Sequence, residues 1–170
     1  MTEDTRMQRG QTWLESLLTL MSVSTNVEAH LEASQIQDGA AQEPDNYWLI
    51  VDETKLSSEQ IKTLIGSEGN VLDAIQYLAN ATLNLHQSQG EQASYTVELD
   101  GYRIRRQAEV QAIASSAAEQ VRASGQEVEI KSLSSAERRQ VHTFLKGFSD
   151  LETFSRGKEP HRHLVVRQLP

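Results

Sequence analysis

Apolar residues change their spacing several times along this 170-residue chain, and the order of the changes limits the possible folds. Strand-like alternation is present in "TNVEAHLEA", "YWLIVDE" and "SYTVELD". Helical spacing is present over residues 11–21, in "LSSEQIKTLIG" and from Val71 to Leu83, and "QDGAAQEPDN" is typical of a loop. The first hundred residues therefore predict the order helix, strand, strand, helix, loop, helix, strand. This order indicates an α+β unit with a small antiparallel sheet covered by helices on one face.

The remaining residues predict a second α+β unit in the order helix, strand, helix, strand, strand. "YRIRRQAEVQAIASSAAEQVRASG" has helical spacing, and Gly125 is placed to end that helix. "QEVEIKSL" follows as a strand, and "SSAERRQVHTFLKGF" opens with Ser134 and has Glu137 three residues later, which is a capping box. "LETFSRGKEPHRHLVVRQ" predicts two short strands around a turn at 157–160. We expect a flexible N-terminus over 1–10 and two domains over 11–100 and 101–170.

The formal charge of -8 is distributed unevenly between the two halves. Residues 1–99 hold 4 Lys and Arg against 15 Asp and Glu, whereas residues 100–170 hold 12 against 9. Lys and Arg supply most of the affinity for nucleic acid by neutralising phosphates, so the average charge alone argues against such a partner. The asymmetry instead indicates a second half that faces a polyanion and a first half that faces solvent or a protein partner.

Several classes of protein find no support in the sequence. The chain has no cysteine, which excludes disulfides and thiolate metal sites and favours a reducing compartment, and its apolar clusters are too short for stable membrane insertion. His161 and His163 alternate on an expected strand, but no third ligand with suitable spacing accompanies them, so we expect no metal. No nucleophile, base or carboxylate set supports a nuclease. We therefore expect a cytoplasmic protein that is not an enzyme and uses no cofactor.

The helix predicted from "SSAERRQVHTFLKGF" carries the strongest binding signal. Arg138, His142 and Lys146 recur at every fourth residue, beside an apolar face that includes Val141 and Leu145. We expect this helix to present donors in a row about 6 Å apart, to which a single strand of nucleic acid binds. The last strands add further cations that extend the same surface: Arg156, Lys158, Arg162 and Arg167. The alternative is a charged face that is only solvated.

"LIGSEGNVLDAIQYLAN" places Gly66 and Gly69 three residues apart between two expected helices. A glycine-flanked loop that opens a helix directs backbone N–H groups outward, which suits a phosphate. Glu68 has the wrong charge for that task, and a plain turn between helices explains most such matches. We interpret Trp48, like Trp13, as a core anchor.

Four segments in register resemble one bacterial family. They are "LIGSEGNVLDAIQYLAN", "DGYRIRRQ", "SSAERRQVHTFL" and "SRGKEPHRHLVV", and the resemblance that they mark spans about residues 12–168, nearly the whole chain. This set resembles the Jag proteins, also called KhpB or SpoIIIJ-associated proteins, in a cyanobacterial-type form. The family joins a type II KH domain, with a three-stranded sheet and helices on one face, to an R-three-H domain of order αβαββ. The resemblance implies an RNA-binding protein that acts as a post-transcriptional regulator or RNA chaperone.

The resemblance also implies which residues bind single-stranded RNA, or single-stranded DNA. The loop glycines and the two residues between them match the GXXG loop of KH domains, which clamps the nucleic-acid backbone. Arg138 and His142 match the Arg-x-x-x-His motif, and Arg162 follows the family's closing Glu-Pro pattern. The expected nucleic-acid-binding set is Gly66, Ser67, Glu68, Gly69, Arg138, Arg139, His142, Lys146, Arg156, Lys158, Arg162 and Arg167.

Two departures from the family pattern leave an alternative open. Many relatives place Lys or Arg between the loop glycines, where this chain has Ser67 and Glu68, and longer members carry an additional N-terminal domain. A carboxylate in the loop repels phosphate. The alternative function is therefore a protein-interaction scaffold, in which the acidic KH half pairs with a second KH protein such as KhpA. Tyr102 precedes Arg103 and Arg106 on one helical face, where it lies near the RNA or packs against the linker.

Overall fold

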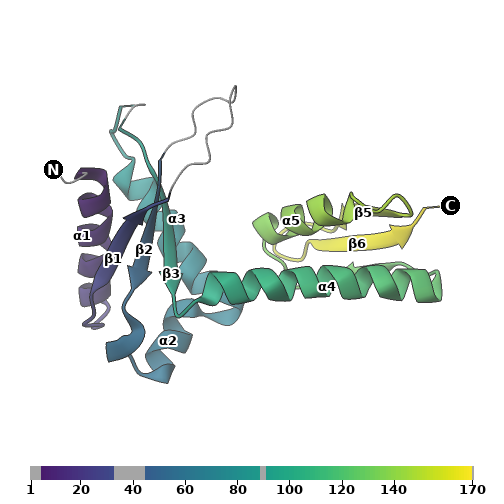
Figure 1. Cartoon of the computed structure of the whole chain (residues 1–170), viewed down its shortest axis with the longest axis horizontal. Coiled ribbons are helices and arrows are strands. Elements are labelled where there is room, and N and C mark those ends of the chain that lie inside the picture. The colour runs from purple at the N-terminus through teal and green to yellow at the C-terminus, as the bar shows by residue number, and fades with distance from the viewer. Residues whose placement is uncertain (1–4, 33–44, 89–90, 170) are drawn as a thin grey trace. The chain divides into compact units, whose positions relative to one another are not determined.

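The structure is a computed structural model that describes residues 5–32, 45–88 and 91–169. The chain divides into two compact units, residues 1–103 and 104–170 (Figure 1). Both units combine helices with a small three-stranded sheet, so the predicted α+β class is confirmed. The first unit contains α1 (Thr5–Leu20), β1 (Val27–Leu31), β2 (Asn46–Val51), α2 (Ser58–Ile65), α3 (Asn70–Leu83) and β3 (Ser94–Leu99).

The first sheet has the strand order β1-β2-β3 and is mixed. Strands β1 and β2 are antiparallel, with Ala29 opposite Leu49, whereas β2 and β3 are parallel, with Leu49 opposite Val97. The prediction of an antiparallel sheet was therefore wrong. Strands β2 and β3 are parallel because α2 and α3 lie between them in the sequence. These helices carry the chain back to the end of the sheet at which β2 begins, and β3 begins at that same end.

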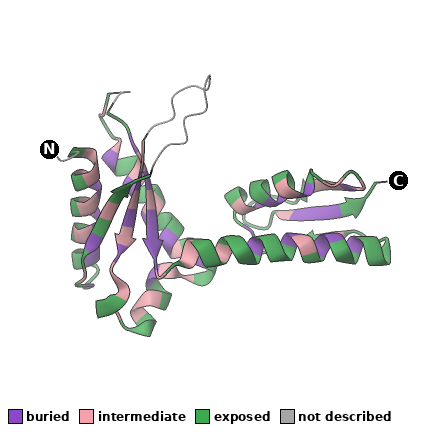
Figure 2. Cartoon of the chain, viewed as in Figure 1, coloured by how far each residue is buried: buried purple, intermediate pink, exposed green. Residues whose placement is uncertain are grey.

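Helices cover one face of this sheet. The alternating residues Tyr47 and Leu49 of β2 and Tyr95 and Val97 of β3 are fully buried on that face. Figure 2 shows buried segments, in purple, along the strands of this sheet. These alternating residues pack with the buried residues of the helices, among which are Leu14, Leu18, Leu72, Ile75 and Ala79. Gly10 allows α1 to approach closely, because a Cβ atom there would lie 2.6 Å from Cε1 of Tyr95.

Two predictions about the first unit, one on its N-terminus and one on Trp48, need correction. Helix α1 begins at Thr5, so residues 5–10 are helical rather than a flexible N-terminus, and Gly10 is buried in its contact with the sheet. Residues 1–4, and all but the last two residues of the expected loop over 37–46, lie outside the described residues. Trp48 is half-buried on the sheet face opposite the buried Tyr47 and Leu49, so it is no core anchor, whereas Trp13 packs partly buried against the core.

The second unit has a different sheet and core. It contains most of α4 (Tyr102–Ser124), β4 (Val128–Ile130), α5 (Ser135–Leu145), β5 (Leu151–Arg156) and β6 (His163–Gln168). Its sheet has the order β4-β6-β5, and β6 is antiparallel to both neighbours. Small side chains on α4, including Ala114 and Ala117, let the helix pack closely on Leu164 and Val166 of β6 and on Val141 of α5.

The predicted C-terminal end of α4 and the predicted start of α5 are confirmed. Gly125 follows α4 with a φ of 66°, and its N–H donates to the carbonyl of Val121. Ser134 and Glu137 form the capping box at the start of α5. Burial raises the pKa of Glu137, but hydrogen bonds from Arg106 and Ser134 outweigh this effect and hold its pKa below the ordinary value. The Arg106 Nε atom lies 2.7 Å from Glu137 Oε1 and thereby ties α4 to the first turn of α5.

Candidate nucleic-acid interface

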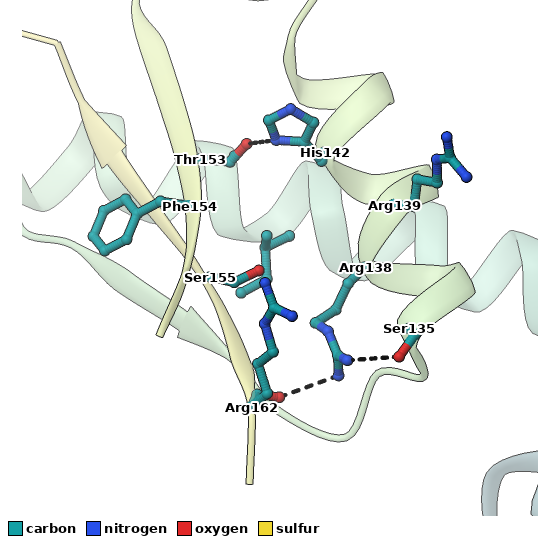
Figure 3. A pocket seen from close by; sticks show the side chains of 9 residues that line it. Ser135, Arg138, Arg139, His142, Thr153, Phe154, Ser155 and Arg162 are labelled. Carbon is teal, nitrogen blue, oxygen red and sulfur yellow. Dashed lines mark hydrogen bonds between the residues drawn. The ribbon is translucent and has the colours of Figure 1, made fainter. Parts of the chain in front are cut away.

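A polar pocket of about 370 Å³ lies in the second unit, between α5 and β5 (Figure 3). Helix α5 contributes basic side chains to it, strand β5 contributes hydroxyl groups, and the chain leading into β6 closes it. The lining residues are Ser135, Arg138, Arg139, His142, Thr153, Phe154, Ser155, Arg162 and Leu164. The pocket therefore brings together four residues of the predicted set and adds three hydroxyl donors, which sequence reasoning did not single out.

Arg138 is buried, with only 7% of its surface exposed, and its guanidinium is used within the protein. The Nη1 atom donates to the carbonyl of Leu133 at 2.7 Å and to that of Arg162 at 3.2 Å. The Nη2 atom donates to Ser135 Oγ at 2.9 Å and forms an ion pair with Glu159. Figure 3 shows this side chain lying between the first turn of α5 and Arg162. The arginine of the Arg-x-x-x-His motif thus joins two segments instead of pointing into solvent.

The predicted row of donors along α5 is therefore incomplete. Arg138 lies three and seven residues before Val141 and Leu145, so it shares their buried face. This register was the available signal for its burial. His142 is exposed, and its Nδ1 atom is hydrogen-bonded to the hydroxyl of Thr153. Lys146 is exposed at the C-terminal cap of α5.

Arg139 and Arg162 are the exposed guanidinium groups of the pocket. Within the described residues, neither one forms an ion pair, and the same holds for the exposed Lys146 and Lys158. Figure 3 shows Arg139 at the rim, pointing away from β5, and Arg162 beside Ser155. These groups keep their full positive charge toward solvent, which suits the binding of an anion.

Arg156 and Arg167 lie on the other face of the second sheet. In the register of β5 and β6, Phe154 faces Val165, and these alternate with the core-facing Leu164 and Val166. Both guanidinium groups lie over the Phe154 ring, at 5.5 Å for Arg156 and 5.2 Å for Arg167. Figure 3 shows that the Phe154 ring points away from Arg138 and His142.

Both outer-face arginines are paired with carboxylates. Arg156 contacts Glu127 at 2.7 Å and Glu129 at 2.9 Å, and Arg167 pairs with Glu152. Hydrogen bonds from Arg156 to these carboxylates raise the pKa of Arg156, and the bond to Glu127 lowers the pKa of that carboxyl. Their charges are therefore compensated on a face that the pocket does not share. The structure does not bring them together with Arg139 and Arg162.

The glycine-flanked loop belongs to the first unit and has a structural reason for both glycines. Gly66 has a φ of 75°, and a Cβ atom there would lie 2.9 Å from the backbone nitrogen of Val71. Gly69 has a φ of 81° and is buried, and its Cβ atom would lie 2.5 Å from the ring of Tyr102. Tyr102 therefore packs against the loop, while Ser67 and Glu68 are exposed, Glu68 with a φ of 54°.

Replacing Gly69 with alanine tests this packing. We expect Gly69→Ala to lower the free energy of unfolding by about 2–4 kcal/mol, because the methyl group strains the backbone and collides with Tyr102. Gly125→Ala is the matched control, since Gly125 has a φ of 66° but nothing within 4 Å of its Cβ position, so it carries the backbone cost of about 1 kcal/mol alone. Thermal and denaturant unfolding of both variants measure the two losses. A loss for Gly69→Ala equal to that for Gly125→Ala would contradict the assigned contact.

Arg138 and its neighbour Arg139 provide a second pair of substitutions with opposite expectations. Arg138→Gln leaves the carbonyls of Leu133 and Arg162 without donors, so we expect a loss of about 3 kcal/mol in the stability of the second unit. Arg139→Gln changes an exposed side chain and is expected to alter stability by less than about 0.5 kcal/mol. Chemical denaturation of both variants measures the difference, and an unaltered Arg138→Gln midpoint would show that the guanidinium is dispensable for the fold.

Two other features are absent from the described part of the chain. No cluster of three or more His, Asp or Glu side chains suited to a metal ion is found there. Among the helices described, none has the length and apolar character needed to cross a bilayer.

Comparisons with known proteins place these observations in a family context. The sequence model of the R-three-H domain family matches residues 108–168 of this chain. A protein of Lactiplantibacillus plantarum named RNA-binding protein KhpB is 36% identical over 103 residues, which are 61% of this chain and 31% of that protein. Proteins of the same name from Bacillus subtilis and Clostridium symbiosum are each 29% identical over 65% of this chain, covering 53% and 49% of their own lengths.

The matched segment thus spans from 31% to 53% of the length of these curated relatives. The R-three-H match covers α5, β5 and β6 entirely, and with them every residue that lines the pocket. Residues 108–168 of this chain accordingly match the R-three-H domain, and the chain is similar to three proteins named KhpB.

Proposed function

We propose that this protein binds single-stranded RNA through the pocket of its R-three-H domain, without cleaving it. The observation that carries the proposal is the pairing of two uncompensated guanidinium groups, Arg139 and Arg162, with hydroxyl donors in one pocket. The three relatives named above are RNA-binding proteins by name, which supports the same ligand. We further propose that the protein works in the cytoplasm, which its cysteine-free sequence suits.

The pocket supplies three kinds of contact to a sugar–phosphate backbone. Arg139 and Arg162 provide charge-assisted hydrogen bonds to phosphate oxygens. His142 provides a third contact. In the tautomer in which Nδ1 accepts a hydrogen bond from the Thr153 hydroxyl, the ring proton is on Nε2, and Nε2 donates to a phosphate. Ser155 adds a hydroxyl group that suits the ribose 2′-OH or a phosphate, whereas the Ser135 hydroxyl accepts from Arg138 and donates to Glu159. Lys146 and Lys158 contribute attraction from outside the pocket.

Arg138 acts in this proposal as a positioning residue. Its bond to the Arg162 carbonyl fixes the backbone that carries the Arg162 guanidinium, and its bond to Ser135 holds the first turn of α5. The motif arginine of the R-three-H domain therefore shapes the pocket, while its neighbours contact RNA.

Salt dependence tests the assignment of the phosphate contacts. We expect Arg139→Gln and Arg162→Gln each to weaken binding of a single-stranded oligonucleotide about tenfold at low salt, because each removes a charge-assisted bond. Each is also expected to reduce the slope of log K against log salt by about 0.7. Fluorescence anisotropy over a salt series measures both quantities.

The control for this experiment keeps the net charge constant. Glu152→Gln combined with Arg167→Gln removes an ion pair from the outer face of the sheet, so we expect affinity and salt slope to stay at the parent values. If the control and Arg139→Gln reduce the slope equally, the pocket is not the phosphate-binding surface.

We propose a smaller contribution to RNA binding from the first unit. Residues 1–99 carry 15 acidic against 4 basic residues, and Glu68 is exposed in the loop between the two glycines. A carboxylate at this place opposes any attraction that the N–H groups at the start of α3 exert on a phosphate.

Glu68→Lys distinguishes two roles for the loop between Gly66 and Gly69: weak binding of RNA, or binding of a protein partner. We expect the substitution to raise RNA affinity about three- to tenfold, because it replaces repulsion of the phosphate by attraction. Glu59→Lys is the matched control, since Glu59 is also exposed in the first unit but lies on α2. An equal gain from both would indicate a general charge effect, and no gain from Glu68→Lys would favour a protein partner, such as a second KH protein, at the loop.

A further inference from the structure

A second hollow of about 220 Å³ lies in the second unit, between α4 and α5. Its floor is apolar, and amide side chains surround it. The lining residues are Gln107, Val110, Gln111, Ala114, Gln140, Val141 and Phe144. No cationic residue lines this groove, so its chemistry differs from that of the pocket between α5 and β5.

The three glutamines have hydrogen-bonding capacity to spare. Gln107, Gln111 and Gln140 are exposed, and among the described residues none of their amides has a hydrogen-bond partner. Each primary amide offers two N–H donors and a carbonyl acceptor. An array of this kind matches a ligand with alternating donors and acceptors along one edge.

Phe144 supplies an aromatic surface at the same place. It is half-buried, packs against the core of the second unit and contacts Phe148 edge-to-face, with ring centroids 5.6 Å apart. These contacts hold the ring while part of it faces the groove. Aromatic rings that are held in this way serve as stacking platforms for unpaired bases.

The groove is continuous with the proposed phosphate-binding pocket along the surface of α5. A shallow hollow of about 730 Å³ lies between them and contains Arg139, Gln140 and Phe144. Arg139 also lines the pocket, and Gln140 and Phe144 also line the groove. Arg139 and Phe144 are five residues apart on α5, which is about 7.5 Å along the helix axis and about 140° around it. Because both side chains nevertheless line the same hollow, a strand whose phosphate contacts Arg139 can pass along that hollow and place a base at Phe144.

We infer that the groove between α4 and α5 is a base-binding subsite, which takes one unpaired purine base, adenine in preference, from the RNA strand held at Arg139. This inference rests on the proposed function. A phosphate is a poor occupant because the groove has no cation, and a duplex does not expose its bases for stacking. Glutamine side chains pair with adenine through one donor and one acceptor, which gives the preference.

Oligonucleotides with and without a base test the subsite. The probes are single-stranded oligoadenylate, oligouridylate and an oligoadenylate with abasic positions, all of the same length and measured by anisotropy with the full chain. We expect Phe144→Leu and Gln140→Ala each to weaken oligoadenylate binding about tenfold. Both variants should bind the abasic strand like the parent and keep the parent's salt slope, since neither substitution removes a phosphate contact.

One control and one exposed test variant make the result decisive. Gln120→Ala changes an exposed glutamine of α4 that does not line the groove, so it should leave every affinity unchanged. Gln140 is exposed, so Gln140→Ala tests the subsite without the folding risk that accompanies a change at Phe144.

The outcomes separate the two proposals. If Arg139→Gln lowers affinity and salt slope while Phe144→Leu and Gln140→Ala lose nothing, RNA binding stands and the base subsite is overturned. Equal losses on abasic and base-bearing strands also overturn the subsite. If the parent chain binds none of the probes, the proposed function fails and the subsite fails with it.

Discussion

The contacts of the Arg138 guanidinium are the interaction on which the pocket of the second unit depends. This guanidinium joins the carbonyl before α5, the hydroxyl in the first turn of α5, and the carbonyl and carboxylate of the connection between β5 and β6. A planar guanidinium with five donors can serve several acceptors at once, which an ammonium group on a flexible stem does not do equally well. The contacts of Arg138 join the start of α5 to the chain that leads into β6, and both segments line the pocket. The exposed Arg162 owes its position to the same contact.

In the described part of the second unit, most arginine side chains form ion pairs within the protein. Within the described part of the second unit, Arg106, Arg122, Arg156 and Arg167 all form ion pairs with Glu or Asp side chains. The excess of basic residues over 100–170 therefore overstates how much positive charge faces a ligand. Among the described residues of this unit, Arg139 and Lys146 of α5 and Arg162 before β6 form no ion pair, and neither do Lys131 and Lys158. A protein with a net charge of -8 can bind a polyanion through a small surface of this kind, because screening limits repulsion from distant carboxylates.

The sequence predicts the local features of this fold well. The capping box at Ser134 and Glu137, the glycine end of α4 and the strands around the 157–160 turn depend on neighbouring residues, and the structure confirms them. The mixed first sheet was not predicted, because strand direction depends on where the intervening helices deliver the chain. The candidate site is harder to predict for a related reason. Helical spacing placed Arg138 with His142, but the same spacing also places it with the buried Val141, and only the partners contributed by other segments decide between the two.

The contact between Gly69 and Tyr102 has a consequence for how such loops are interpreted. The aromatic ring occupies the space that any larger side chain at this position would need. A related protein with no affinity for nucleic acid at this loop would still need that glycine for its own packing. A glycine at this position in a related sequence therefore indicates that the packing against the aromatic ring is kept. The two residues between the glycines are the ones that indicate which ligand the loop suits.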